Sequence, residues 1–147
     1  MMQSCWFQKT ISLSSRSQGC YLITEEVLNA IGAEIKQVDV GMCNLFLAHT
    51  SAGLALGENC DPTVRSDMRN FFNKMVPEGK GLYEHDYEGP DDMPAHIKSA
   101  ITGVSINIPI SKGAMMLGTW QGIWLMEYRA HKHTRHLTIT VNGQKGQ

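Results

Sequence analysis

Apolar and polar residues follow regular periods along most of the chain, and these periods predict its secondary structure. The segment 4–13 alternates moderately, which predicts a strand. The apolar run 45–48 predicts a buried strand over residues 42–48, and 51–57 predicts a smaller-residue strand that is a candidate hairpin partner for it. Four more strands are predicted, over residues 104–110, 114–117, 122–129 and 135–141.

Two segments in the first half of the chain carry helix-start signals. Thr24 precedes an acidic first turn and an apolar series with helical spacing, so we expect Thr24 to be the N-cap of a helix. Asp61 followed by Pro62 predicts the start of a second helix, because the missing N–H of proline costs nothing at the first helical position. Pro77 is expected to end this helix.

The segment 78–92 is rich in Gly, Tyr, Asp and Glu and predicts a loop of a length that is usually functional or disordered. Asp92 is expected to cap a short helix over 94–101, which Gly103 ends. In the strand that follows, Pro109 predicts an edge or a bulge because it donates no backbone N–H.

The order of these elements predicts one α+β domain spanning residues 1–147. Helices and strands are segregated, which favours a largely antiparallel β-sandwich with helices packed on it. The chain is 42% hydrophobic, which is sufficient for one core without disulfides or a structural metal. Four widely spaced cysteines without a C-x-x-C pair indicate reduced thiols and a cytoplasmic protein.

Charge and hydropathy exclude two classes of partner. The formal net charge is −1 and the Lys and Arg residues are scattered, whereas nucleic-acid proteins normally carry a basic patch. No apolar stretch approaches the roughly 20 residues that span a bilayer. The N-terminal residues lack the basic and apolar regions of a secretory signal. We therefore expect no nucleic-acid or membrane partner.

Candidate chemistry begins where the apolar run ends. His49, Thr50 and Ser51 follow the predicted buried strand, and His85 and His96 lie in the polar segment and the helix after it. Neutral imidazole is the commonest metal ligand, and catalytic zinc often takes three protein ligands and a water. We predict that His49, His85 and His96 converge, within one chain or across two, to hold zinc. The alternative is three unrelated hydrogen-bonded imidazoles.

Carboxylates gather in the same half of the chain, where a pair could serve as general acid and base. The alternative is that they are helix caps and solvated loop charges. The set is Glu58, Asp61, Asp67, Asp86, Glu88, Asp91 and Asp92.

Two turns are candidate anion contacts. Residues 118–122 place Thr119, Trp120 and Gln121 between two glycines, and such a turn can offer backbone N–H groups to an anion. The alternative is a β-bulge with a packing Trp. The basic run 131–136 could touch phosphate, or it could be a solvated turn.

Taken together, the motifs resemble one known family over residues 7–143. The stretches that carry the likeness are 49–52, 58–64, His85 with 89–96, 108–109 with Gly113, and 117–123. In this order they resemble the YjbQ-like, or secondary thiamine-phosphate synthase, family.

This resemblance implies a homotrimer whose polar motifs gather at a subunit-interface cleft that takes a small anionic or phosphorylated ligand. It also implies a weak thiamine phosphate synthase activity, which joins a pyrimidine diphosphate to a thiazole phosphate. The expected metal ligands are His49, His85 and His96. The expected catalytic side chains are His49, Asp61 and Asp92, with Asp91 nearby. The expected substrate contacts are Thr50, Ser51, Asn59, Thr119, Trp120 and Gln121.

Two functional hypotheses follow. In the first, the protein is a metal-assisted enzyme acting on a phosphorylated small molecule. In the second, it is a non-enzymatic trimeric metal- or small-molecule-binding protein. The His-rich ligand set suits zinc, whereas magnesium, the usual partner of a departing pyrophosphate, prefers oxygen.

Overall fold

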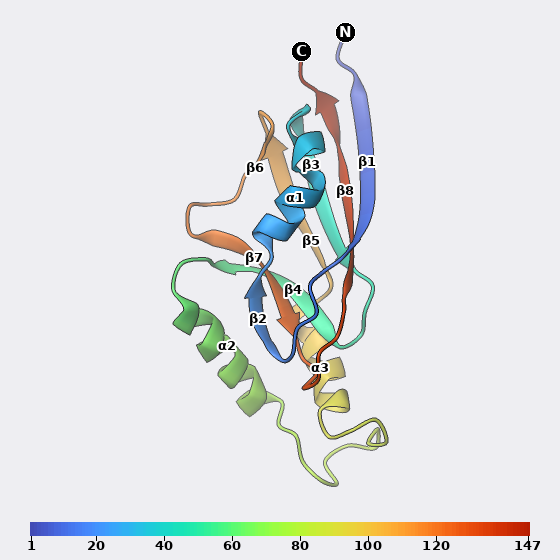
Figure 1. Ribbon diagram of the computed structural model, residues 1–147, viewed down its shortest axis with the longest axis vertical. Helices are drawn as coiled ribbons and strands as arrows, with labels where there is room; N and C mark the ends of the chain where they lie inside the picture. Colours follow the sequence, from blue (N-terminus) through green and yellow to red (C-terminus); the bar gives the residue numbers. More distant parts are fainter.

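The computed structural model describes residues 1–147 as two antiparallel β-sheets and three helices (Figure 1). The larger sheet contains, in spatial order, β1 (Ser4–Ser12), β8 (His136–Lys145), β3 (Val38–Leu47), β5 (Ser105–Ser111) and β6 (Ala114–Met115). The smaller sheet contains β2 (Gly19–Leu22), β7 (Gln121–Glu127) and β4 (Ala52–Glu58). The helices are α1 (Thr24–Ile35), α2 (Pro62–Met75) and α3 (Asp92–Thr102). The expected α+β class with antiparallel sheets is confirmed.

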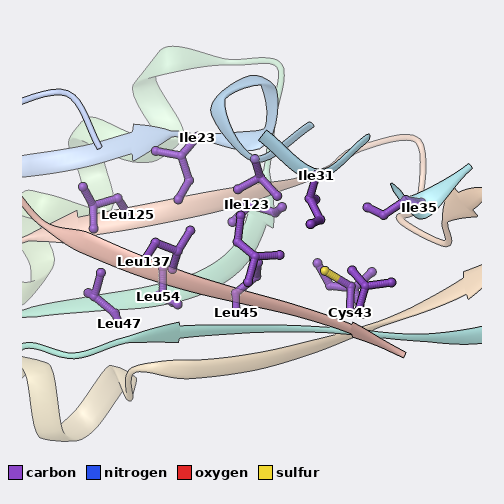
Figure 2. Close-up of a cluster of buried hydrophobic side chains, with 14 of the residues drawn as sticks. Ile23, Ile31, Ile35, Cys43, Leu45, Leu47, Leu54, Ile123, Leu125 and Leu137 are labelled. Atoms are coloured by element: carbon purple, nitrogen blue, oxygen red, sulfur yellow. The ribbon is translucent and has the colours of Figure 1, made fainter. Parts of the chain in front are cut away.

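The main core lies between the two sheets, and α1 closes it at one end. The inward residues of β3, such as Leu45, pack against Ile31 of α1 and Ile123 of β7 (Figure 2). These side chains are fully buried. Burying a side chain of this size stabilises the fold by roughly 1.5–3 kcal/mol relative to leaving it in water. The alternating pattern in β3 therefore fixes which of its faces meets the core.

A smaller core lies on the opposite face of the three-stranded sheet, beneath α2 and α3. Trp124 and Met126 of β7 point to this side, where they meet Phe72 of α2 and Ala95 of α3. Ile123 and Leu125 of β7 point to the main core. Because β7 is buried on both faces, its central residues 123–126 are apolar without interruption.

Helix boundaries match the sequence expectations at α2 and differ at the other two helices. Asp61 caps α2 as predicted, since its side chain accepts a hydrogen bond from the Thr63 N–H. The expected cap at Thr24 is wrong by one residue, because α1 begins at Thr24 and the Thr24 hydroxyl accepts the Ile123 N–H from β7. A neighbouring strand thus uses the hydroxyl that was expected to cap the helix.

The expected cap at Asp92 is also wrong. Asp92 is the first residue of α3, Asp91 occupies the N-cap position, and neither side chain makes a capping hydrogen bond. The Asp92 side chain is buried and turns to other partners, which are described below. Gly103 ends α3 as predicted, with a φ of 82° that disfavours residues with a Cβ.

The pairing of residues 51–57 differs from the suggested hairpin. Residues 52–58 form β4, which does not pair with β3 in the larger sheet. It pairs with β7 in the smaller sheet. Pro109 directs its backbone N and carbonyl to the side of β5 away from β3, as expected for a residue that lacks a backbone N–H. Its carbonyl accepts the Met116 N–H on the outer side of β5, where β6 covers only two residues. No helix is long and apolar enough to cross a membrane.

Candidate functional site

The candidate site lies where the N-terminal half of α3 meets the start of β4. The Ser99 hydroxyl donates to the Ala52 carbonyl at 2.7 Å, and the Leu54 N–H donates to the Gly103 carbonyl at 3.0 Å. Gly53 permits this approach, because a Cβ there would collide with the Thr102 side chain. The helix is therefore fixed directly against the strand that follows the His49–Ser51 motif.

Asp92 lies at the centre of a cluster with two histidines. His85 Nε2 is 2.7 Å from Asp92 Oδ2, and His96 Nε2 is 3.1 Å from the same oxygen. Asp92 and His96 are four residues apart on α3, so they share one helix face. His85 reaches them from the preceding loop, and its ring centroid lies 5.4 Å from that of His96. Asp92 is 1% exposed, so the cluster is anchored on a buried carboxylate.

The second nitrogen of His96 fixes the orientation of its ring. Nδ1 lies 2.7 Å from the Thr50 backbone carbonyl, which only accepts hydrogen bonds, so Nδ1 carries a proton. Metal-ligating histidines almost always donate their other ring N–H to a carbonyl or a carboxylate in this way. His96 is thus oriented with Nε2 toward Asp92 Oδ2.

Arg129 holds the carboxylates of Asp91 and Asp92 together from the end of β7. Its Nε donates to Asp91 Oδ2 at 2.9 Å, and its Nη1 lies 2.9 Å from Asp92 Oδ1. Burial raises the pKa of the Asp92 carboxyl, but the hydrogen bond from His85 and the charges of His96 and Arg129 outweigh it. The net effect is a pKa below the usual range. Asp92 is therefore an anion at neutral pH.

The donor set fits a divalent cation. One ligand atom from each of His85, Glu88, Asp92 and His96 lies within 4.8 Å of the others. Tetrahedral zinc with bonds of about 2.0–2.1 Å places neighbouring ligand atoms about 3.3 Å apart, so these side chains need only small shifts to meet it. Asp92 Oδ1 is buried and accepts no hydrogen bond, since its contact with Arg129 lacks hydrogen-bond geometry. Oδ2, which faces both imidazoles, is the carboxylate oxygen that a cation between them would use.

His49 belongs to a neighbouring network and not to this cluster. Its Nε2 accepts the His136 N–H at 2.8 Å, and its Nδ1 lies 3.5 Å from Arg135 Nη1. Arg135 is buried and paired with Glu127, and it also donates to Ser51 Oγ at 2.9 Å. Burial and the positive charge of Arg135 lower the pKa of His49, so its ring is neutral at pH 7. The chain therefore brings together two of the three predicted histidines.

An open cavity of about 600 Å³ joins the two networks. His49 and His96 both line it, together with Thr50, Ser99 and Gly103. This volume falls within the roughly 300–1,000 Å³ typical of small-molecule sites. His49 therefore borders the same space as His96, the member of the His85–Asp92–His96 cluster that lines the cavity.

The other predicted site residues lie at the far end of the smaller sheet. β4 pairs with β7 from Ala52 opposite Glu127 to Glu58 opposite Gln121. This register separates the two ends by about 20 Å at roughly 3.3 Å per residue. The far end carries Asn59, Asp61, Thr119, Trp120 and Gln121.

At that far end, Asn59 Nδ2 donates to the Thr119 and Gln121 carbonyls, and Gln121 Oε1 accepts the Gly118 N–H. Asn59 and Gln121 line a separate cavity of about 520 Å³. Trp120 is 65% exposed. Within one chain, the turn at 118–122 therefore does not border the histidine cavity.

Sequence reasoning did not assign two residues of the cluster. Glu88 appeared only among the loop carboxylates, although it stands three residues after His85, and its Oε2 lies 4.0 Å from His85 Nε2. Arg129 carried no local signal, because its role depends on β7 ending beside α3. Asp92 was predicted both as a helix cap and as a catalytic side chain, and the structure places it at the centre of the cluster. Its spacing of four residues from His96 was the signal that could have shown the shared helix face.

Comparisons with known proteins agree with the motifs. A model of the UPF0047 YjbQ-like family matches residues 9–144. The UPF0047 protein YjbQ of Escherichia coli O157:H7 is 52% identical over 95% of this chain and 99% of its own length. A UPF0047 protein of Methanocaldococcus jannaschii is 37% identical over 84% of each chain.

Solved structures of YjbQ-like proteins share the fold of this chain. A YjbQ/UPF0047 family protein of Clostridium acetobutylicum superimposes with a TM-score of 0.74 at 34% identity, covering 90% of this chain and 97% of that one. A protein of unknown function from Sulfolobus solfataricus has the same fold, with a TM-score of 0.85 at 22% identity over 96% of this chain and 99% of that one. The chain therefore belongs to the UPF0047 YjbQ-like family.

Proposed function

We propose that this protein is a metal-assisted enzyme that acts on a phosphorylated or otherwise anionic small molecule. Zinc would be held by His85, Asp92 and His96, with Glu88 or water at the remaining position. The observation that carries the proposal is the convergence of two imidazoles on one buried carboxylate at the border of an open cavity. Formation of thiamine phosphate would be one activity of this site.

A bound divalent cation would neutralise charge on the phosphate oxygens of the substrate and of the leaving group. The protein side chains supply the rest. Arg129 holds Asp91 and Asp92 in place, so the carboxylate at the centre of the cluster cannot turn away. The Thr50 carbonyl fixes the His96 ring. The site is therefore ordered before a substrate arrives, which avoids reorganisation during the reaction.

His49 is proposed as the polar side chain that faces the substrate from the other wall. Because Nε2 accepts the His136 N–H, a neutral ring carries its proton on Nδ1. That N–H and the Arg135 guanidinium lie side by side and form a pair of donors suited to an anionic oxygen. The predicted role of His49 as a metal ligand would require its ring to leave the His136 amide.

We also propose the homotrimer implied by the family, with the outer face of the larger sheet as its interface. Three cross-strand rows of that face carry no charged residue, although 18% of the chain is charged. The three rows are Thr10, Thr138, Phe46 and Ser105, then Gln8, Thr140, Asn44 and Asn107, then Trp6, Asn142, Met42 and Pro109.

Three of these side chains, Trp6, Met42 and Phe46, are large, apolar and exposed in the single chain. An exposed apolar patch of this kind marks an interaction surface. His136 continues the face and contacts His49, so a docked copy would add a second wall to the histidine cavity. A neighbouring copy is also the means by which the turn at 118–122 could reach that cavity.

The experiment compares zinc-loaded and chelator-stripped protein in a turnover assay with the pyrimidine diphosphate and the thiazole phosphate. We expect turnover in the zinc-loaded protein, loss of turnover after stripping with the oligomer intact, and loss in His96→Ala. His131→Ala is the matched control, because the His131 side chain is exposed and makes no hydrogen bond to His85, Asp92 or His96.

The outcomes separate the hypotheses. Zinc binding without turnover on any phosphorylated substrate would favour the non-enzymatic metal-binding alternative. Turnover that survives complete removal of the metal would contradict the proposal and assign the chemistry to the His and carboxylate side chains alone.

A further inference from the structure

Two arginines on α2 differ from the other arginines of the chain. Arg16, Arg129 and Arg135 each form an ion pair with a carboxylate. Arg65 and Arg69 have no carboxylate within 4.0 Å. They are four residues apart on α2, so their side chains leave the helix on the same face. Two positive charges therefore lie together without an ion-pair partner.

Both side chains line one cavity between α2 and the edge strand β2. The cavity has a volume of about 230 Å³ and contains no acidic residue, and its remaining lining includes Gln18, Gly19 and Ser66. The hydrogen bonds of the two guanidinium groups are long, at 3.5 Å from Arg65 Nη1 to the Glu58 carbonyl and 3.4 Å from Arg69 to Asn70 Oδ1. Most of their N–H groups are thus available to a ligand.

Nearby carboxylates are directed elsewhere. Glu58 accepts the N–H groups of Cys60 and Asp61, and Asp61 accepts from Thr63 as the helix cap. The charged side chains that line the cavity are therefore the two guanidinium groups alone. Burial raises the pKa of the Cys20 thiol to about 11, while the charges of Arg69 and Arg65 act in the opposite direction.

We propose that this cavity is a binding site for a phosphate group. Guanidinium forks match phosphate oxygens with two parallel N–H···O bonds, and paired arginines are typical where phosphate is recognised. The Gln18 side chain adds a donor, because its oxygen is used by Asn73 and its amide nitrogen has no partner. The volume is below the range for a drug-sized ligand and suits one phosphoryl group, free or terminal on a larger molecule.

This site shares no lining residue with the histidine cavity or with the His85–Asp92–His96 cluster. The inference therefore does not depend on the proposed metal chemistry. It can be tested with a chelator present, so that failure of the zinc site and failure of the phosphate site are distinguishable.

The test is an amide NMR titration with inorganic phosphate in the presence of EDTA. In the wild type we expect saturable shifts of the Gly19, Cys20 and Tyr21 resonances. The double variant R65Q/R69Q should weaken phosphate binding at least tenfold, with an unchanged circular dichroism spectrum. K74Q is the matched control, since it removes one exposed positive charge from the same helix without touching the cavity, and it should change affinity less than twofold.

If the double variant does not fold, Arg69→Lys replaces it, because Lys keeps the charge but loses the fork and should still weaken binding severalfold. Equal phosphate affinity in the wild type and R65Q/R69Q would overturn the proposal. So would a change in oligomeric mass in R65Q/R69Q with no phosphate response in the wild type, which would assign the arginines to a subunit contact.

Discussion

Asp92→Asn is the substitution that most directly probes the cluster, because it keeps the shape of the side chain and removes its charge. Asp92 Oδ2 receives two histidine contacts, and Oδ1 faces Arg129. Hydrogen bonds to charged groups contribute about 1.5–3 kcal/mol each, and stranding one partner of a fully buried ion pair costs about 3–5 kcal/mol.

Two features reduce this cost. The histidine side chains are 33% and 29% exposed, so water screens part of each interaction. Arg129 also keeps Asp91 as a partner. We therefore expect Asp92→Asn to lower the free energy of unfolding by about 2–4 kcal/mol. Zinc affinity should fall at least 100-fold, since a neutral amide replaces the anionic ligand at the centre of the set.

The assays are urea unfolding at pH 7 in EDTA and zinc competition against a chromophoric chelator. Asp86→Asn is the matched control, since Asp86 lies in the same loop and is exposed. It should change the unfolding free energy by less than about 0.5 kcal/mol. The reasoning fails if Asp92→Asn unfolds like the wild type, or if it binds zinc equally well.

Three further predictions concern the surroundings of the site. Gly103→Ala should destabilise the fold by roughly 1–3 kcal/mol through backbone strain alone, because φ is 82° and ψ is 170°, a region essentially restricted to glycine, and a Cβ would meet no atom within 4 Å; an unchanged melting curve would contradict this. Burial and Arg135 lower the pKa of His49, so the unfolded chain takes up that proton more readily. Stability should therefore fall as pH drops below about 6.5, less steeply in His49→Gln, and equal slopes of unfolding free energy between pH 5 and 7 would argue against it. Phe46→Glu should convert the proposed trimer to monomers, measured as molar mass by light scattering, with the exposed residue Lys132 changed to Glu as the control; a trimer that survives Phe46→Glu would exclude that sheet face as the interface.

Much of the fold was predictable because the signals were local. The start of α2 follows from Asp61 and Pro62, the end of α3 from Gly103, and the buried strand β3 from its apolar run. The sheet that residues 51–57 join was not predictable, because a period of two shows that a strand has an inward face and does not name its neighbour. That choice depends on the long-range pairing of β4 with β7.

The site shows the same division between local and long-range information. The residues that form the cluster stood in segments with a visible polar character, and two of the three predicted histidines meet. His49 is separated from them because β3 ends beside β8, where the His136 amide occupies Nε2 of its ring and Arg135 lies beside Nδ1. Arg129 and Glu127 act through strands that pair across long sequence distances, so no short motif contained their roles.

The central claim is that His85, Asp92 and His96 bind a metal, and anomalous X-ray scattering tests it most directly. A crystal grown with zinc should be measured above and below the zinc absorption edge. We predict an anomalous peak about 2.0–2.1 Å from the Nε2 atoms of His85 and His96 and within a similar distance of an Asp92 oxygen. Zinc-containing crystals in which no peak lies at this cluster, or in which the only ordered zinc lies on other ligands, would contradict it.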